Sequence, residues 1–140
     1  MSRALVLAQF TCIAVLLFGG GWALPWWAWS LFGTGLGVFA WAAVSLGTVN
    51  FTVMPEPREG NELSQRGIYR FLRHPMYTAV LLCGIAVAFG APSLLRSAAL
   101  PGCLVVLVLK VRHEERVLTA RHSDYPERMK RVARLCPGVW

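Results

Sequence analysis

Two groups of polar side chains in a mostly apolar chain have the types and spacing that could do chemistry. In the first, within 67–77, Arg73 and His74 immediately precede Pro75 and an apolar run. An arginine and a histidine beside a hydrophobic helix are costly in lipid unless they lie at its water-facing edge or in a polar cavity. Proline suits the first turn of a helix, where its missing N–H loses no hydrogen bond. We therefore expect Arg73 and His74 at the mouth of a helix, with Tyr77 on the same face as Arg73.

The second group is the run 112–116, Arg-His-Glu-Glu-Arg, which follows another apolar run. It begins like the zinc motif H-E-x-x-H, but Val117 stands where the second histidine is required, so no metal site is predicted. One interpretation is that the arginines of both groups anchor helices at a membrane surface and that the glutamates are their solvated partners. The other is that both groups lie on the same side of a membrane and meet in one polar site.

The composition is that of a membrane protein. Of the 140 residues, 56% are hydrophobic and 15% are charged, and the mean hydropathy is +0.51. Ordinary soluble domains are less apolar. The four cysteines form no C-x-x-C pair and are interpreted as free thiols. A net charge of +7 would suggest a nucleic-acid partner for a soluble protein, but membrane topology explains the same charges, so no nucleic-acid partner is predicted.

Four apolar runs predict an all-α bundle of four transmembrane helices. No charged residue lies between Arg3 and Glu56, which leaves room for two spans of about 20 residues each. The runs are 4 to about 20 or 24, 26–48, 76–91 and 94–111. Asp124 and Glu127 fit a capping box for a short cytoplasmic or interfacial helix, which would continue at helical spacing to Cys136.

The charges predict which side of the membrane each segment occupies. Four spans place the N-terminus, the polar loop and the C-terminal segment together, with thirteen of the fourteen basic residues and all seven acidic ones. The positive-inside rule makes that side cytoplasmic. Arg96 alone falls on the other side, and both Arg96 and Lys110 are expected to snorkel from the fourth run. The predicted organisation is one multi-pass membrane domain, 1–140, with a span pair at 1–50, a cytoplasmic loop at 51–72 and a core at 73–140.

Glycines in the second run favour helix packing. Gly33 and Gly37 have the G-x-x-x-G spacing that lets another helix approach closely. The same stretch superficially matches a glycine-rich nucleotide loop, but no strand precedes it, so that interpretation is weak. We expect a second helix to pack on Gly33 and Gly37.

Short motifs then follow one another in a recognisable order. They are Gly67-x-Tyr69, Arg73-His74-Pro75-x-Tyr77, Glu114-Glu115-x-x-Leu118, Tyr125 and Arg131-x-x-Arg134-x-x-Pro137. Together they resemble the isoprenylcysteine carboxyl methyltransferase family and its bacterial relatives over about 63–140. His122-Ser123 stands where that family commonly has Phe-Gly. The wider group includes phospholipid N-methyltransferases, thiol methyltransferases and, with another cofactor, sterol reductases.

This resemblance implies an integral membrane methyltransferase that uses S-adenosylmethionine, without a Rossmann domain. The residues implied in donor binding are Gly67, Tyr69, Arg73, His74, Pro75, Tyr77, Glu114 and Glu115. Those implied in catalysis are Glu115, Arg131 and Arg134, the two arginines as partners of an anionic acceptor. Which glutamate contacts the ribose or the ammonium of the donor stays open.

The expected reaction is methyl transfer to a carboxylate of a lipid-like or prenylcysteine-like acceptor, which reaches the site from the bilayer. A carboxylate is already ionised near pH 7, so positioning and exclusion of water would supply most of the acceleration. Transfer to a phospholipid amine or a thiol would need a proton acceptor, for which Glu115 and His74 are candidates. The remaining alternatives are a related membrane reductase with a nicotinamide cofactor and a non-enzymatic membrane subunit.

Overall fold

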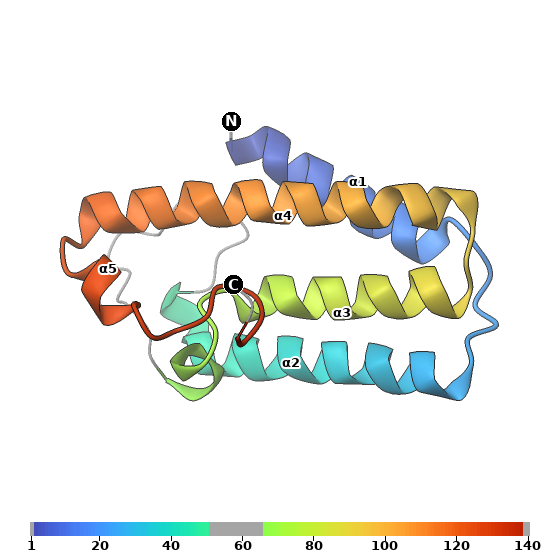
Figure 1. Ribbon diagram of the computed structural model, residues 1–140, viewed down its shortest axis with the longest axis horizontal. Coiled ribbons are helices and arrows are strands. Elements are labelled where there is room, and N and C mark those ends of the chain that lie inside the picture. The colour runs from blue at the N-terminus through green and yellow to red at the C-terminus, as the bar shows by residue number, and fades with distance from the viewer. Residues whose placement is uncertain (1, 51–65, 139–140) are drawn as a thin grey trace.

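The computed structural model describes residues 2–50 and 66–138, which are helical except for their connections and the C-terminal segment (Figure 1). Part of the predicted cytoplasmic loop, 51–65, lies outside the described residues. The elements are α1 (Ser2–Phe18), α2 (Trp26–Asn50), the 3₁₀ turn η1 (Gly67–Arg70), α3 (Pro75–Gly90), α4 (Leu94–Arg121) and α5 (Tyr125–Arg128). The described residues contain no strand, so the prediction of an all-α fold is confirmed.

Two of these helices are long and apolar enough to cross a membrane. They are Trp26–Gly47 and Leu94–Arg121, whereas Arg3–Phe18 and Pro75–Gly90 are apolar but shorter. Only 11% of the apolar window in α2 is buried within the molecule, so α2 is not the core helix of a soluble protein. The remaining two of the four predicted spans stay a prediction.

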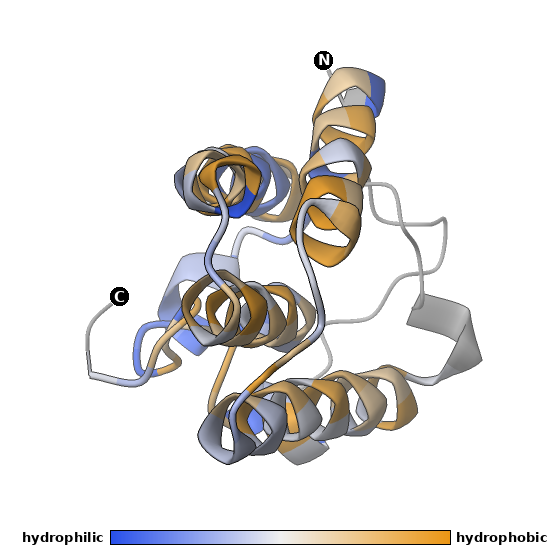
Figure 2. Cartoon of the chain, turned by 90° about the vertical axis from the view of Figure 1, so that its right-hand side faces the viewer, coloured by the Kyte–Doolittle hydropathy of each residue, from blue (hydrophilic) through white to orange (hydrophobic). Residues whose placement is uncertain are grey.

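The helices form three layers, with α3 in the middle (Figures 1 and 2). α1 packs against α4 on one side of α3, and α2 packs along α3 on the other. The core between α1, α3 and α4 contains Leu16, Val87, Cys103 and Leu107. Much of the chain in the helices is hydrophobic (Figure 2), and many large apolar side chains are exposed on the outer surface, as expected where lipid replaces water. α3 therefore contacts α1, α2 and α4, and it lies between α2 on one side and the α1–α4 pair on the other.

The close contact between α2 and α3 lies at Gly35. A Cβ atom on Gly35 would stand 2.6 Å from Cys83 Sγ and 3.1 Å from the Ala79 carbonyl oxygen. Cβ atoms on Gly33 and Gly37 would meet nothing within 4 Å among the described residues. The expectation that Gly33 and Gly37 form the packing face is therefore wrong, because the face that α2 turns toward α3 contains the glycine between them.

Arg96 does not snorkel. Its side chain is completely buried and donates to backbone carbonyls of Leu16 at 2.8 Å, Gly21 at 2.7 Å and Ala91 at 2.8 Å. These carbonyls lie where α1 and α3 end, and the last carbonyls of a helix have no partner within it and carry the negative end of its dipole. One guanidinium therefore caps two helices. Lys110 is also buried, at 1% exposure, so the snorkelling prediction is wrong for both residues.

The C-terminal segment crosses the mouth of α3 as a series of turns and bends. α5 ends at Arg128, and the side chain of Asp124 makes no capping hydrogen bond, so the expected helix from the capping box to Cys136 is wrong beyond its first turn. Instead, the Arg73 amide donates to the Ala133 carbonyl at 2.8 Å, beside a parallel bridge between Leu72 and Ala133. Because the backbone before α3 binds this segment at Ala133 and Arg134, an irregular cover takes the place of a continued helix.

Candidate functional site

Pro75 sets the position of the first site residues. It occupies the first turn of α3 and is fully buried, and His74 before it has a non-helical backbone (φ −127°, ψ 58°). A residue that precedes proline is pushed away from the helical region, so the chain turns at His74. This turn places the His74 side chain against α4, and the predicted location of Arg73 and His74 at the mouth of a helix is confirmed.

Glu115 joins three segments of the chain. Its Oε1 accepts a hydrogen bond from Arg73 Nη1 at 2.9 Å, and its Oε2 accepts one from Arg134 Nε at 2.9 Å. His74 Nε2 lies 3.6 Å from Oε1. The two polar groups of the sequence, which are 42 residues apart, therefore meet in space. The alternative in which the glutamates are merely solvated is not what the geometry shows, since the Glu115 side chain is only 13% exposed.

Glu114 binds the other side of the same imidazole. His74 Nδ1 lies 3.2 Å from Glu114 Oε2, and the Tyr77 hydroxyl donates to Glu114 Oε1. The rings of His74 and Tyr77 are stacked, with centroids 5.7 Å apart and planes 8° from parallel. We call His74, Tyr77, Glu114 and Glu115 the polar cluster. It joins the first turn of α3 to the C-terminal part of α4.

The glutamates favour the charged form of His74. Burial alone would lower the pKa of this imidazole, but its contacts with Glu114 and Glu115 outweigh burial and raise the pKa above its ordinary value of 6.5. Nε2 is buried, and its nearest partner, Glu115 Oε1 at 3.6 Å, is an ion-pair contact beyond hydrogen-bond range. The hydrogen bonding of this donor is therefore incomplete, and such buried donors in native structures call for an explanation.

Arg73 is fully engaged in holding the C-terminal segment. Besides Glu115, its guanidinium donates from Nε to the Val132 carbonyl at 2.8 Å and from Nη2 to the Met129 carbonyl at 2.6 Å. A planar fork with several donors suits such a multiple contact. Arg73 therefore acts in this structure as a positioning residue for Glu115 and the cover, and its expected contact with the donor stays a prediction.

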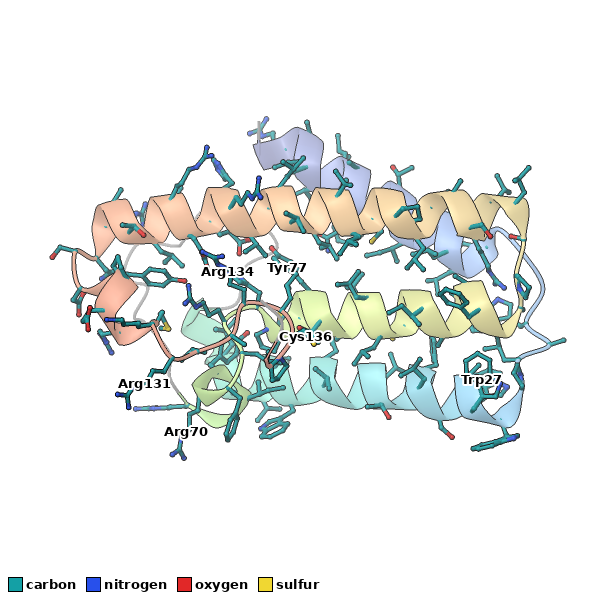
Figure 3. All side chains as sticks on the ribbon, in the orientation of Figure 1. Trp27, Arg70, Tyr77, Arg131, Arg134 and Cys136 are labelled. Carbon is teal, nitrogen blue, oxygen red and sulfur yellow. The ribbon has the colours of Figure 1, made fainter. Side chains whose placement is uncertain are left out.

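The two arginines expected to hold the acceptor lie differently. Arg134 points with Tyr77 into the space between α3 and α4, where its Nε binds Glu115 (Figure 3). Arg131 is exposed and points away from that space, as does Arg70 (Figure 3). Arg134 is therefore at the polar cluster, and Arg131 is outside it.

Two tyrosines flank the polar cluster. Burial, followed by the charge of Glu114, raises the pKa of Tyr69 to about 12. Burial and then Glu115 raise the pKa of Tyr125 to about 12 as well. Both phenols are therefore neutral at physiological pH and can bind a ligand but are poor bases. Gly67 has a positive φ of 53°, and a Cβ there would lie 2.1 Å from Ser45 Oγ of α2, so only glycine seats η1 on that helix.

Lys110 and Gln9 were not expected near the site. Lys110 Nζ donates to Gln9 Oε1 at 2.5 Å and lies 5.0 Å from the centroid of the Tyr77 ring. A signal for Lys110 existed, because an ionisable residue inside a membrane run is by default a functional candidate. The amide of Gln9 gave no such signal in the sequence, because its partner Lys110 lies 101 residues away.

Comparison with known families identifies the class. A family described as phospholipid methyltransferase matches residues 23–124, well over half of the chain, so the chain belongs to that family. The family is related to the isoprenylcysteine carboxyl methyltransferases, so the resemblance is confirmed at the level of this wider group. No curated protein matches the chain. Family and apolar helices together support a membrane-associated methyltransferase that acts on lipid-like substrates.

Proposed function

We propose that this chain is a multi-pass membrane methyltransferase that uses S-adenosylmethionine and methylates a carboxylate of a lipid-like acceptor, such as a prenylcysteine. The observation that carries the proposal is the convergence of Glu114 and Glu115 from α4 on His74 at the mouth of α3. The excess of basic residues at this end of the molecule supports a cytoplasmic site, where the donor is available.

The residues of the polar cluster fit the chemistry of the donor. S-adenosylmethionine carries a sulfonium, an ammonium, a carboxylate and hydroxyl groups. Two partly buried carboxylates suit its cations and hydroxyls, and the Nε2–H of His74, whose hydrogen bonding is incomplete, suits an anionic or hydroxyl oxygen. Tyr69 and Tyr77 add aromatic surface beside these groups, and methyl-bearing cations are attracted to aromatic faces. When bound, this donor supplies an activated methyl group.

The main task of the protein in this reaction is to place the acceptor carboxylate in line with the methyl group of the donor. A carboxylate oxygen of the acceptor forms the new bond to the methyl carbon while the carbon–sulfur bond breaks, and the electron pair of that bond stays on sulfur. No proton has to be removed. Arg134, beside Glu115, adds positive charge for an anionic acceptor, and the cover formed by 129–135 excludes water from the cluster. Arg131 would take part only at the entrance, because it is exposed.

Methylation of a phospholipid amine is the second candidate, and the description of the matched family favours it. An amine must lose a proton, and the Glu114–His74 pair is placed to accept one. The two candidates differ in their products, since carboxyl transfer gives an ester and amine transfer does not.

The test is methyl transfer by the purified chain from S-adenosylmethionine labelled with tritium in the methyl group. The acceptors are a farnesylcysteine analogue and phosphatidylethanolamine. We expect label that alkali releases as volatile methanol, because methyl esters hydrolyse in base and N-methyl or S-methyl groups do not. Base-stable label would favour amine or thiol transfer. Reduction of an acceptor with a nicotinamide cofactor, without methyl transfer, would refute the proposal.

A further inference from the structure

An apolar crevice lies beside the polar cluster. α1 packs on α4 and α2 packs on α3, and a crevice of about 250 Å³ opens between α1 and α2 with α3 as its floor. Representative residues of its three walls are Ile13, Leu16, Leu36, Phe39, Val80 and Gly84. Leu36 and Phe39 are also 54% and 42% exposed on the outer surface, so the crevice opens toward the bilayer.

The crevice leads along two helices to Lys110. On α3, Val80 lies one turn beyond Tyr77, and on α1, Ile13 lies one turn beyond Gln9, so each pair shares a helix face. Tyr77 and Gln9 are the two side chains that contact the Lys110 ammonium. From Ala79 to Val87, the floor spans about 12 Å at 1.5 Å per residue. An apolar chain in the crevice would therefore end beside Lys110.

The charge of Lys110 has no direct counter-ion among the described residues, because Glu114, one turn further along α4, attracts it without forming an ion pair. Its side chain is 1% exposed, and it makes no ion pair with any carboxylate in the part of the chain that the structure describes. Its contacts are a neutral amide and a ring face. A buried ammonium with such partners is costly, and an anion beside it would balance the charge. The same Tyr77 ring stacks on His74, so an anion at Lys110 would adjoin the polar cluster.

We propose that Lys110, oriented by Gln9, binds the carboxylate of the acceptor, whose apolar chain lies in the crevice between α1, α2 and α3. This rests on the proposed function and specifies its acceptor as a carboxylate amphiphile with a linear apolar chain. It also gives α1 a role, although α1 lies outside the residues that match the family.

The test uses a tritiated myristate that carries a photoreactive diazirine near the end of its chain, with the protein in nanodiscs of zwitterionic lipid. We expect adducts on the walls of the crevice, which excess myristate prevents at least tenfold better than tetradecanol or tetradecyl phosphate. Lys110→Met should reduce labelling at least tenfold, and Lys110→Arg should keep it within about threefold. Lys130→Met is the matched control, because that lysine is 72% exposed and pairs with Glu127 at the surface. It should label like the wild type.

A second variant keeps the test informative if Lys110→Met does not fold. Gln9→Glu places a carboxylate against the ammonium and should exclude the ligand's carboxylate, so labelling should fall at least tenfold while helix content is unchanged. Equal competition by tetradecanol, preference for the phosphate, or unchanged labelling in both variants would overturn the proposal. Calorimetry with S-adenosylhomocysteine on the same preparations separates the proposed function from the proposed acceptor site. If the wild type does not bind this donor product, the proposed function is refuted, but binding of a carboxylate amphiphile in the crevice is not.

Discussion

Arg73 shows how one side chain can tie together the segments that form a site. Its guanidinium ties Glu115 on α4 to the Met129 and Val132 carbonyls of the C-terminal segment. Hydrogen bonds to a charged group contribute about 1.5–3 kcal/mol each, so this one residue accounts for much of the attachment of the segment.

Replacing Arg73 should therefore release the C-terminal segment. We expect trypsin to cut Arg73→Met at least fivefold faster than the wild type, because proteolysis follows local opening. The cleavage sites are the basic residues of the segment, Arg128, Lys130, Arg131 and Arg134. Arg70→Met is the control, since Arg70 is exposed and points away from the cluster. Equal cleavage rates in Arg73→Met and the wild type would show that the segment is held by other contacts.

The charge on His74 makes the stability of the protein depend on pH. A pKa raised in the folded state stabilises the fold fully below the ordinary value of 6.5, and the contribution is lost as pH rises through the folded-state pKa. Each pKa unit corresponds to about 1.4 kcal/mol. The Tm difference between the wild type and His74→Gln should thus be largest below pH 6.5 and shrink as the pH rises above that value. A difference that stays constant or grows with pH would contradict this assignment.

At the scale of elements, the α2–α3 contact depends on a single glycine. Gly35→Ala puts a methyl group against Cys83 and the backbone of Ala79, which should cost about 1–3 kcal/mol and lower the Tm in detergent by several degrees. Gly37→Ala should be neutral or stabilising by up to about 1 kcal/mol, because its methyl group meets open space and alanine is the better helix former. The opposite order of Tm values would show that the packing face is the Gly33–Gly37 face after all.

The helices and the meeting of the two polar groups could be predicted from the sequence. Charged side chains are costly in lipid, so those of an apolar chain must lie at its water-facing edge or in a shared polar site. The sequence did not predict Gly35 over Gly33 and Gly37, since the rotation of α2 is set by the neighbour it packs on. Arg96 and Lys110 were misplaced for a related reason. Their partners are carbonyls and an amide on α1 that only the tertiary fold brings within reach. The irregular C-terminal segment was missed because its own backbone groups are its main contacts, bound by the Arg73 side chain and by the amides of 73 and 74, and no pattern of side chains in the segment encodes them.

At the scale of the whole molecule, α3 begins on the side where α4 ends and α5 lies, and the α1–α2 connection lies at the opposite end (Figure 1). The charge distribution then predicts opposite accessibility for two positions. In intact cells, a membrane-impermeant maleimide should label Ala23→Cys, in the connection, but not the native Cys136, which is exposed in the C-terminal segment.

The labelling background replaces the other native cysteines with alanine, namely Cys12, Cys83 and Cys103. The Ala23→Cys variant also carries Cys136→Ser, so that each protein has one thiol. Permeabilised cells provide the positive control for Cys136. Labelling of Cys136 in intact cells would place the site on the outside and reverse the orientation.

The central claim is that the polar cluster binds the donor, and calorimetry with S-adenosylhomocysteine tests it most directly. Glu115→Gln removes the charge shared by Arg73, His74 and Arg134, and Glu127→Gln removes a charge that is 82% exposed. The account predicts binding to the wild type and to Glu127→Gln with equal affinity, and at least tenfold weaker binding, about 1.4 kcal/mol, to Glu115→Gln. Wild-type affinity in both Glu115→Gln and His74→Gln would contradict it.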